Sequence, residues 1–360
     1  MSGSVNPLVG SALVMAGGTG GHIFPGLAVA QALRNAGWNV RWLGAPGSME
    51  SRIVPPQGFA MEFIDFQGVR GKGKLALLAA PWRLLRACTQ SLSLLRRLRP
   101  SVVVGLGGYI SLPAGLTAAL LRIPLVLHEQ NAIAGLSNKL LAQLARRVFS
   151  AYPNALPKAQ WVGNPLRAEF LQQAAPARRF AGRSGPLRLL VVGGSLGARA
   201  LNTVVPQALA LMDAAQRPIV IHQSGEKQID ELRSNYAAAG VQATLTPFID
   251  NTAQAFADAD LVLCRAGAST VTEIAAVGAA AIFVPFPFAV DDHQTHNARF
   301  LVDAGGGWLI AQQELTPAHL AQMLQNLGRD ALLQRAQAAK AMEKTQATAA
   351  MAAACEELSA

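Results

Sequence analysis

Two segments of the chain share one pattern: a short apolar run, a glycine-rich turn and then a helical pattern. The first segment runs from Ser11 to Ala16 and continues into Gly17–His22. The second is the run 187–192, followed by Gly193–Ala198. Glycine lets backbone N–H groups approach a phosphate or a sugar closely, and a helix N-terminus favours an anion. The two units together predict an α/β protein with two Rossmann-like domains, whose parallel sheets face a central cleft.

The composition agrees with this class. A chain of 360 residues that is 51% hydrophobic and 14% charged can hold two folded domains. We expect the domains at 1–165 and 166–340, joined near Asn164-Pro165, with an Ala-rich helix after Asp330 whose end, 341–360, packs back on the first domain. No apolar run is long enough to span a membrane, and the N-terminus lacks the basic region of a signal peptide. Three scattered cysteines fit a reducing compartment and have no metal-ligand spacing.

The net charge of +10 suggests nucleic acid or an anionic membrane surface as a partner, and a basic protein with no special partner is the alternative. The sequence shows neither the aromatic interleaving nor the helix-turn-helix signature of nucleic-acid binders, so we expect no nucleic acid. Residues 66–99 combine a basic glycine-rich loop with leucines and Trp82 set among arginines, which is typical of a helix at an anionic membrane surface. An ordinary core-facing helix with a solvated basic face is the alternative, because Pro81 interrupts the periodicity.

Several nucleotide-binding classes are excluded. In a dinucleotide fingerprint the third glycine would fall at Ile23, and no acid follows the second predicted strand, 38–44. No Lys-Ser/Thr pair follows the glycines of the first turn, which excludes a P-loop there. The D-x-D sequence Asp258-Ala259-Asp260 lies at the amino end of its predicted strand, so we interpret it as structural and predict no metal site.

Polar residues follow three predicted strands of the first half. They are Thr19 and His22, then Tyr109, then His128 to Asn131. Ligands of open parallel sheets bind at the carboxyl ends of the strands, so we expect these groups to share a site.

The second half has its most informative stretch at 259–278. A strand ends at Cys264, and a helix is expected to start near Ser269, where its N-terminus can hold a diphosphate. Glu273 is then placed to accept hydrogen bonds from ribose hydroxyls. A capping box formed by Thr270 and Glu273 is the alternative. Gln294 and Asn297 follow another strand and suit sugar hydroxyls.

With these motifs in place, the sequence closely resembles the MurG family of bacterial UDP-N-acetylglucosamine transferases. The resemblance spans almost the whole chain and rests on eight motifs in series: GGTGGHIFPGLAVA, RGKGK, GLGGYIS, LHEQNAIAGLSNK, VGNPLR, VVGGSLGA, CRAGASTVTE and DDHQTHNA. It implies a GT-B fold and a metal-independent, cofactor-free, inverting hexosyl transfer. The donor is UDP-N-acetylglucosamine, and the acceptor is the C4 hydroxyl of undecaprenyl-diphospho-N-acetylmuramoyl-pentapeptide, in the last cytoplasmic step of peptidoglycan precursor synthesis.

The resemblance also implies peripheral attachment to the cytoplasmic side of the inner membrane, with proteins of cell-wall synthesis or division as partners. Carried over residue by residue, it assigns a set of residues to the donor: Thr19, Gly20, Gly21, Asn131, Arg167, Ser195, Ile249, Ala268, Ser269, Thr270, Val271, Thr272, Glu273 and Gln294. Ile249 suits backbone recognition of uracil, and Arg265 suits the diphosphate. Leu196 stands where the family usually has glutamine.

We predict that His22 is the catalytic base, since imidazole exchanges protons near neutral pH. The alternative is that it caps or orients the glycine loop. On the acceptor side we place Tyr109, His128, Glu129 and Asn138. Three other functions remain open from the residues: transfer to another lipid, epimerisation of UDP-N-acetylglucosamine, and non-catalytic binding of a UDP-sugar at the membrane.

Overall fold

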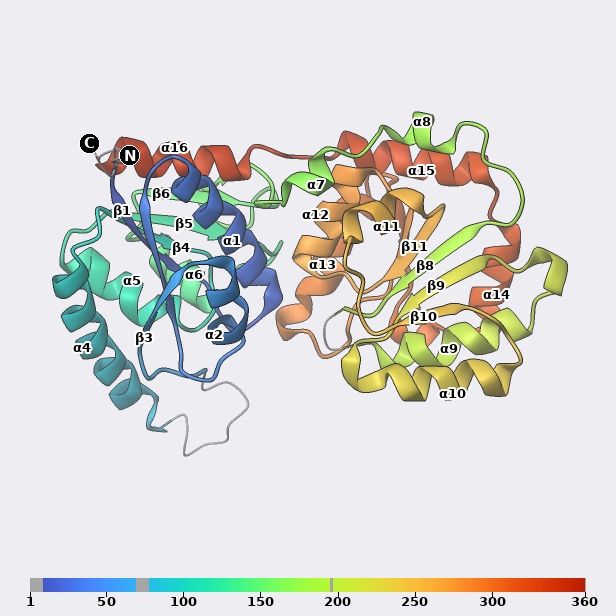
Figure 1. The fold of residues 1–360 in the computed structure, drawn as a ribbon, viewed down its shortest axis with the longest axis horizontal. Helices are drawn as coiled ribbons and strands as arrows, with labels where there is room; N and C mark the ends of the chain where they lie inside the picture. The colour runs from blue at the N-terminus through green and yellow to red at the C-terminus, as the bar shows by residue number, and fades with distance from the viewer. Residues whose placement is uncertain (1–8, 69–77, 195–196, 360) are drawn as a thin grey trace, which may run out of the picture. The chain divides into compact units, whose positions relative to one another are not determined.

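The computed structural model describes residues 9–68, 78–194 and 197–359. The chain divides into two compact units (Figure 1). The first comprises the chain up to Leu166 together with Lys344–Ala360, and the second is Arg167–Glu343. Ser195, Leu196 and the RGKGK loop at 70–74 lie outside the described residues.

The first unit is built on a seven-stranded parallel sheet in the order β3-β2-β1-β4-β5-β6-β7. The strands are β1 (Ser11–Met15), β2 (Asn39–Gly44), β3 (Ala60–Phe63), β4 (Val102–Gly105), β5 (Leu125–Glu129), β6 (Arg147–Ser150) and β7 (Gln160–Trp161). The predictions of strands at 11–16 and 38–44 and around 101–111 and 124–129 are confirmed, whereas β3, β6 and β7 were not predicted.

Helices cover both faces of this sheet. They are α1 (Gly20–Asn35), α2 (Glu50–Ile53), the 3-10 turn η1 (Pro55–Gln57), α4 (Ala80–Leu98), α5 (Ser111–Leu120), α6 (Leu136–Leu141) and α16 (Ala347–Ser359). Successive strand residues point to opposite faces. Val14 therefore packs in one cluster with Val29 of α1 and Met351 of α16, while Leu13 packs in another with Leu95 of α4.

The second unit has a six-stranded parallel sheet in the order β10-β9-β8-β11-β12-β13. The strands are β8 (Arg188–Val192), β9 (Ile219–Gln223), β10 (Thr244–Thr246), β11 (Leu261–Cys264), β12 (Ala281–Phe283) and β13 (Gly307–Leu309). The helices and 3-10 turns are α7 (Ala168–Leu171), α8 (Pro176–Phe180), α9 (Arg199–Ala210), η2 (Ala214–Gln216), η3 (Glu226–Gln228), α10 (Ile229–Ala239), α11 (Thr252–Asp258), α12 (Ala268–Val277), η4 (Val290–Asp292), α13 (His293–Val302), η5 (Gln312–Glu314), α14 (Pro317–Asn326) and α15 (Arg329–Ala341). The predicted α/β class with two parallel sheets is confirmed.

The C-terminal segment is two helices, so the prediction of one long helix from Asp330 is wrong. Residues 342–346 separate α15, which lies in the second unit, from α16, which lies beside α1 in the first (Figure 1). Met351 and Cys355 of α16 are fully buried. The chain enters α16 past Gly163, where a side chain would clash because its Cβ would lie 2.2 Å from the carbonyl oxygen of Lys344.

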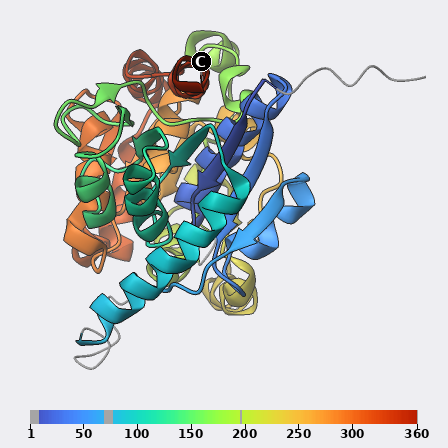
Figure 2. The ribbon, with the colours of Figure 1, turned by 90° about the vertical axis from the view of Figure 1, so that its left-hand side faces the viewer.

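Helix α4 has two distinct parts. Its C-terminal half buries Ala87, Ser91, Leu94 and Leu95. Its N-terminal turns extend away from the sheet (Figure 2) and expose Trp82 at 72% and Leu85 at 55%. Pro81 is the second residue of α4 and lies in its first turn, where its missing N–H costs nothing. It is therefore compatible with the helix, and the expectation that it interrupts the helical pattern is wrong. Within the described ranges, no helix is long and apolar enough to cross a bilayer.

The structural interpretation of Asp258-Ala259-Asp260 is confirmed. Asp258 ends α11, and the buried Asp260 precedes β11. The carboxylate of Asp260 pairs with Arg183 at 2.6 Å and Arg329 at 3.3 Å, and it accepts the backbone N–H of Arg188 at 2.9 Å. These partners account for both carboxylate oxygens.

Candidate active site

Each sheet has one point where the strand order reverses, which is where ligands of open α/β sheets bind. In the first unit this point lies between β1 and β4, and in the second between β8 and β11. The two glycine turns leave β1 and β8, so each turn lies at the reversal point of its own sheet.

His22 is held by the first glycine turn. Helix α1 begins at Gly20, with Thr19 as its N-cap. The Nδ1 atom of His22 lies 3.2 Å from the carbonyl oxygen of Gly17 and 3.2 Å from Oγ1 of Thr19. A carbonyl oxygen only accepts, so we assign the proton of the neutral ring to Nδ1. Orienting the loop, the alternative role of His22, uses Nδ1 and leaves Nε2 as the basic nitrogen. The two roles are therefore compatible.

The turn after β4 packs directly on the first glycine turn. A Cβ on Gly108, which has φ +84°, would lie 2.3 Å from the carbonyl oxygen of Gly17. A Cβ on Gly107 would lie 3.1 Å from Nε2 of His22. Close approach of the two turns therefore requires glycine at Gly108, and the φ of +90° favours glycine at Gly107. Tyr109 lies against Gly18, and burial followed by the nearby Glu50 carboxylate raises the pKa of its phenol.

His128 is part of the protein interior. Its Nε2 donates to the carbonyl oxygen of Gly163 at 2.8 Å, and its Nδ1 accepts from Gln130 at 3.0 Å. Burial lowers the pKa of His128 to about 4, although the bond to Gly163 opposes this. His128 is thus neutral and holds backbone, so any effect on an acceptor would be indirect.

Glu129 organises the loop that follows β5. Its carboxylate accepts the backbone N–H groups of Asn131 at 2.8 Å and Gly135 at 3.2 Å, and the side-chain amide of Asn138 at 2.8 Å. Burial raises the pKa of Glu129, and these hydrogen bonds oppose the rise. Asn138 also donates to the carbonyl oxygen of His128 and lies beside Gly107. Of the predicted acceptor-side residues, His128, Glu129 and Asn138 therefore form one hydrogen-bonded network, whereas Tyr109 lies apart from it against Gly18. Asn138 and His22 both lie beside Gly107, and Thr19 contacts His22.

Glu50 joins this group and was not predicted. It is fully buried at the start of α2. Its Oε2 accepts the backbone N–H of Gly18 at 3.1 Å, and its Oε1 accepts that of Ala45 at 3.2 Å. A hollow of about 310 Å³ adjoins this point, lined by Ala45, Pro46, Gly47, Ser48, Gln67, Gly68 and Tyr109. No local pattern around Glu50 marks it, because its partner in the glycine turn, Gly18, lies 32 residues away in the sequence.

Gln223 plays the corresponding part in the second unit. From the end of β9, its amide oxygen accepts the N–H of Gly194 at 3.1 Å. Its amide nitrogen donates to the carbonyl oxygens of Gly194 at 3.1 Å and Pro247 at 2.9 Å. Gln223 thus holds the second glycine turn by both backbone polar groups of Gly194, its N–H and its carbonyl oxygen. A polar end to the strand 218–225 was the only sequence signal for Gln223.

A series of hydrogen-bonded side chains supports the same turn. His222 contacts the hydroxyl of Tyr236 at 3.1 Å and the side-chain oxygen of Asn202 at 3.0 Å. Asn202 donates in turn to Gln228, whose amide nitrogen would lie only 2.7 Å from a Cβ on Gly197. Burial lowers the pKa of His222 to about 3, so the series carries no charge at neutral pH.

The N-terminus of α12 forms the other side of this site. The helix begins at Ala268 with Gly267 as N-cap, so Thr270 lies inside the first turn and the alternative of a Thr270–Glu273 capping box is wrong. The Ser269 hydroxyl has no hydrogen-bond partner within the described part of the chain. Burial raises the pKa of Glu273 to about 7, and the charge of Arg167 opposes this. Val271 and Thr272 are buried in the helix.

The remaining candidates of the second unit brace neighbouring loops. Arg265 donates to the carbonyl oxygens of Val284 at 3.0 Å and Pro285 at 3.2 Å, and to Gln312 at 2.7 Å. Gln294 accepts the N–H of Phe286 at 2.9 Å, and the buried Asn297 donates to Ala266 at 3.2 Å. Arg167 pairs with Glu169 at 2.7 Å. Ile249 lies between β10 and α11, where its carbonyl oxygen accepts from Thr252 at 3.4 Å.

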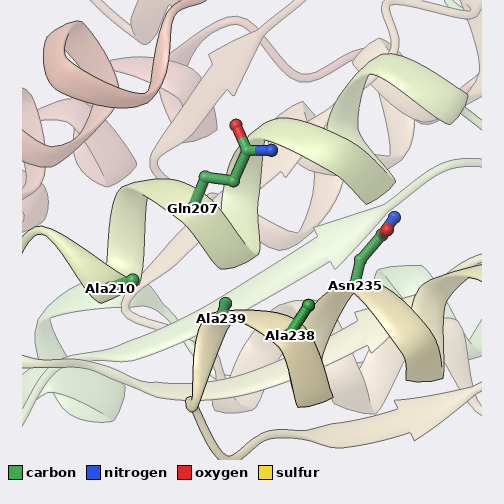
Figure 3. Close-up of a pocket in the computed structure, with 5 residues that line it drawn as sticks. All are labelled: Gln207, Ala210, Asn235, Ala238 and Ala239. Carbon is green, nitrogen blue, oxygen red and sulfur yellow. The ribbon is translucent and has the colours of Figure 1, made fainter.

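A second hollow, of about 270 Å³, lies between α9 and α10 (Figure 3). It is lined by Gln207, Ala210, Asn235, Ala238 and Ala239. Ala210 and Ala239 end their helices, which run back along the strands, so this hollow lies toward the amino ends of the strands. It is therefore no part of the candidate site. Among the residues that the structure describes, no group of three His, Cys, Asp or Glu side chains is arranged to hold a metal ion.

Comparison with known proteins places both units in one family. Residues 12–150 match the glycosyltransferase family 28 N-terminal domain, and residues 188–354 match the glycosyltransferase family 28 C-terminal domain. The chain is similar in structure to MurG of Acinetobacter baumannii, with a TM-score of 0.85 at 40% identity over 97% of this chain and 99% of that one. It also shares its fold with the Streptomyces glycosyltransferase SsfS6 in complex with thymidine diphosphate, at 19% identity and a TM-score of 0.62 over 94% of this chain and 98% of that one.

Curated relatives match along nearly their whole length. The chain is 70% identical to the "UDP-N-acetylglucosamine--N-acetylmuramyl-(pentapeptide) pyrophosphoryl-undecaprenol N-acetylglucosamine transferase" of Paracidovorax citrulli, over 97% of this chain and 99% of that protein. It is 69% identical to the transferase of the same name from a Polaromonas strain, over 96% of this chain and 91% of that protein. With both domains matched and identity this high over the full length, the chain belongs to glycosyltransferase family 28 and, within it, to the MurG family of N-acetylglucosamine transferases.

Proposed function

We propose that this chain transfers N-acetylglucosamine from UDP-N-acetylglucosamine to the C4 hydroxyl of undecaprenyl-diphospho-N-acetylmuramoyl-pentapeptide, with inversion at the anomeric carbon. The observation that carries the proposal is the 70% identity, over 97% of the chain, to a transferase named for this reaction. The geometry of each unit supports a division of labour between donor and acceptor.

The second unit binds the donor in this proposal. The diphosphate lies at the N-terminus of α12, where the helix dipole and the Ser269 hydroxyl meet an anion. The uracil meets backbone groups near Ile249, and the ribose donates to Glu273. The amide of Gln294 reads the sugar. The helix N-terminus and the Ser269 hydroxyl offset the charge that UDP gains as the glycosidic bond breaks.

The first unit supplies the base. Because Nδ1 of His22 faces Gly17, its Nε2 is the basic nitrogen. In one displacement the acceptor oxygen bonds to the anomeric carbon, the bond from that carbon to UDP breaks, and Nε2 takes the hydroxyl proton. Asn138 lies beside Gly107, as His22 does, and Tyr109 lies against Gly18 of the same turn, so in this proposal both contact the acceptor sugar.

Attachment to the cytoplasmic face of the inner membrane is supported by α4. Leu78, Trp82 and Leu85 are exposed at 78%, 72% and 55%, next to the exposed Arg83 and Arg86. Apolar side chains between arginines suit insertion among anionic headgroups. The double variant Trp82→Glu, Leu85→Glu is expected to lose sedimentation with phosphatidylglycerol vesicles. Leu211→Glu, an equally drastic change at an exposed leucine of the second unit, is expected to retain it.

The transfer is tested with labelled UDP-N-acetylglucosamine and a short-chain lipid-linked muramoyl-pentapeptide, with and without chelator. The expected product is one disaccharide-lipid, formed at the same rate in both cases and identified by mass spectrometry. Conversion of the UDP-sugar without acceptor would instead identify an epimerase. Binding of UDP with no turnover of either kind would identify a non-catalytic protein.

A further inference from the structure

A buried carboxylate stands behind the first glycine turn. Glu50 has no exposed surface, and among the described residues it forms no ion pair. Removing a carboxylate from water costs several kcal/mol unless hydrogen bonds replace the lost hydration. Packing alone does not require a carboxylate there, so its role lies in the hydrogen bonds that it makes.

Those hydrogen bonds join two loops that are far apart in sequence. One oxygen accepts from Gly18 in the β1–α1 turn and the other from Ala45 after β2. Room for the side chain is made by two glycines, since a Cβ on Gly17 would lie 2.7 Å from Oε1 and a Cβ on Gly44 would lie 2.8 Å from Cγ. Both oxygens must accept, which a carboxylate does and a primary amide does not.

His22 grips the same peptide unit from its other end. The carbonyl oxygen of Gly17 faces Nδ1 of His22, and the N–H of the next residue, Gly18, faces Glu50. These two groups belong to one planar peptide, so fixing the N–H fixes the direction of the carbonyl. The carbonyl in turn selects the ring tautomer and holds the ring plane.

We propose that Glu50 is a positioning residue for His22, acting through the Gly17–Gly18 peptide. The inference rests on the proposed function, in which Nε2 of His22 is the base. Glu50 touches neither donor nor acceptor. It keeps the peptide aligned so that Nδ1 carries the proton and Nε2 is directed at the acceptor hydroxyl.

The test compares Glu50→Gln and Glu50→Asp with a control, Glu62→Gln. Glu62 is the other buried carboxylate of this unit's β1–β3 region, but it pairs with Arg41 and Arg97 at 2.5 and 2.6 Å, away from the turn. In Glu50→Gln the side-chain NH2 faces one of the two backbone N–H groups, so we expect kcat to fall about 10- to 100-fold, with the donor KM within about twofold of wild type. Aspartate keeps two acceptors, so we expect Glu50→Asp to recover part of kcat. Glu62→Gln is expected to stay within about twofold in kcat.

Two further measurements separate positioning from loss of structure. Titration calorimetry with UDP is expected to give the wild-type Kd in Glu50→Gln. Nitrogen-15 spectra of histidine-labelled protein, with the His22 signals assigned by their absence in His22→Gln, are expected to show an Nδ1–H ring in wild type and a tautomer mixture in Glu50→Gln.

The outcomes distinguish this inference from the function it rests on. If wild type is inactive, the proposed function fails. If wild type is active but Glu50→Gln keeps its kcat, loses only donor affinity, or retains the Nδ1–H tautomer, the positioning role is overturned. Equal losses of kcat in Glu50→Gln and Glu62→Gln also overturn it.

Discussion

The two glycine turns look alike in sequence and differ in what holds them. Glu50, a carboxylate, accepts from Gly18 in the first unit, whereas Gln223, a neutral amide, both accepts from and donates to Gly194 in the second. In the first turn, the negatively charged Glu50 therefore contacts the N–H of Gly18, and His22 contacts the carbonyl oxygen of Gly17. The second has an uncharged support, the chain from His222 to Gln228, and lies at the same sheet edge as the N-terminus of α12.

This difference distinguishes two functions of a glycine-rich turn, holding a catalytic base and binding a phosphate. A negative charge near the first turn opposes a phosphate and favours a positive group, such as the imidazolium that forms when His22 takes a proton. A neutral support leaves the helix dipoles of the second unit available to the diphosphate. A glycine turn before a helix is therefore not enough to identify a phosphate site. The charge of the residue behind it also matters.

The largest expected effect comes from removing the group that the first turn holds. His22→Ala is expected to lower kcat by about 10² to 10⁴-fold, the range for a lost general base, with the Kd for UDP unchanged. Initial rates and titration calorimetry measure the two quantities. Full turnover in His22→Ala would remove the base from the first turn and, with it, the proposed division of labour.

The next comparison exchanges one glycine in each unit. Both Gly108 and Gly194 have positive φ, +84° and +83°, but a Cβ on Gly108 meets the Gly17 carbonyl, whereas one on Gly194 meets nothing within 4 Å. In Gly194→Ala, backbone strain alone should lower the free energy of unfolding, by about 1 to 2 kcal/mol. In Gly108→Ala the clash adds to the strain, so the free energy of unfolding should fall by about 3 kcal/mol or more. Calorimetric unfolding measures both, and equal losses would contradict the close approach of the two turns in the first unit.

A charge introduced behind the second turn tests the comparison directly. Gln223→Glu sets a carboxylate oxygen against the carbonyls of Gly194 and Pro247, so we expect the donor KM to rise about tenfold and stability to fall by about 1 to 3 kcal/mol. The matched control is Gln207→Glu, at an exposed position on α9 of the same unit. A donor KM unchanged by Gln223→Glu would mean that charge behind this turn is unimportant.

The smallest effect is a pH dependence of donor binding. Glu273 has a pKa of about 7, so it is protonated at pH 6 and ionised at pH 8. Ribose hydroxyls donate better to the ionised form, and the donor KM should therefore fall by about fivefold between pH 6 and pH 8. In Glu273→Gln the KM should be high and flat across this range. A control on α10, Glu231→Gln, whose half-buried carboxylate pairs with Arg199 at 2.9 Å, should keep the wild-type profile. A slope that persists in Glu273→Gln would assign the titration to another group.

Local patterns of the sequence predicted much of this protein. Apolar runs marked β1, β2, β4, β5, β8 and β11, and the glycines marked the turns that leave β1 and β8, because these signals lie within a dozen residues. The polar residues at the strand ends were found for the same reason. The start of α12 was placed one residue late, and the Thr270–Glu273 capping box proposed as an alternative was wrong, since that motif is equally compatible with the interior of a first turn.

The tertiary structure alone decided which residues support the site. Glu50 lies 32 residues from Gly18 and Gln223 lies 29 from Gly194, and each pair meets only because the sheet sets neighbouring strand ends side by side. The break between α15 and α16 is of the same kind, since the second of these helices packs on α1 far away in the chain. A hydrogen bond between distant residues depends on strand order and packing, and the composition and periodicity of either segment contain no record of its partner.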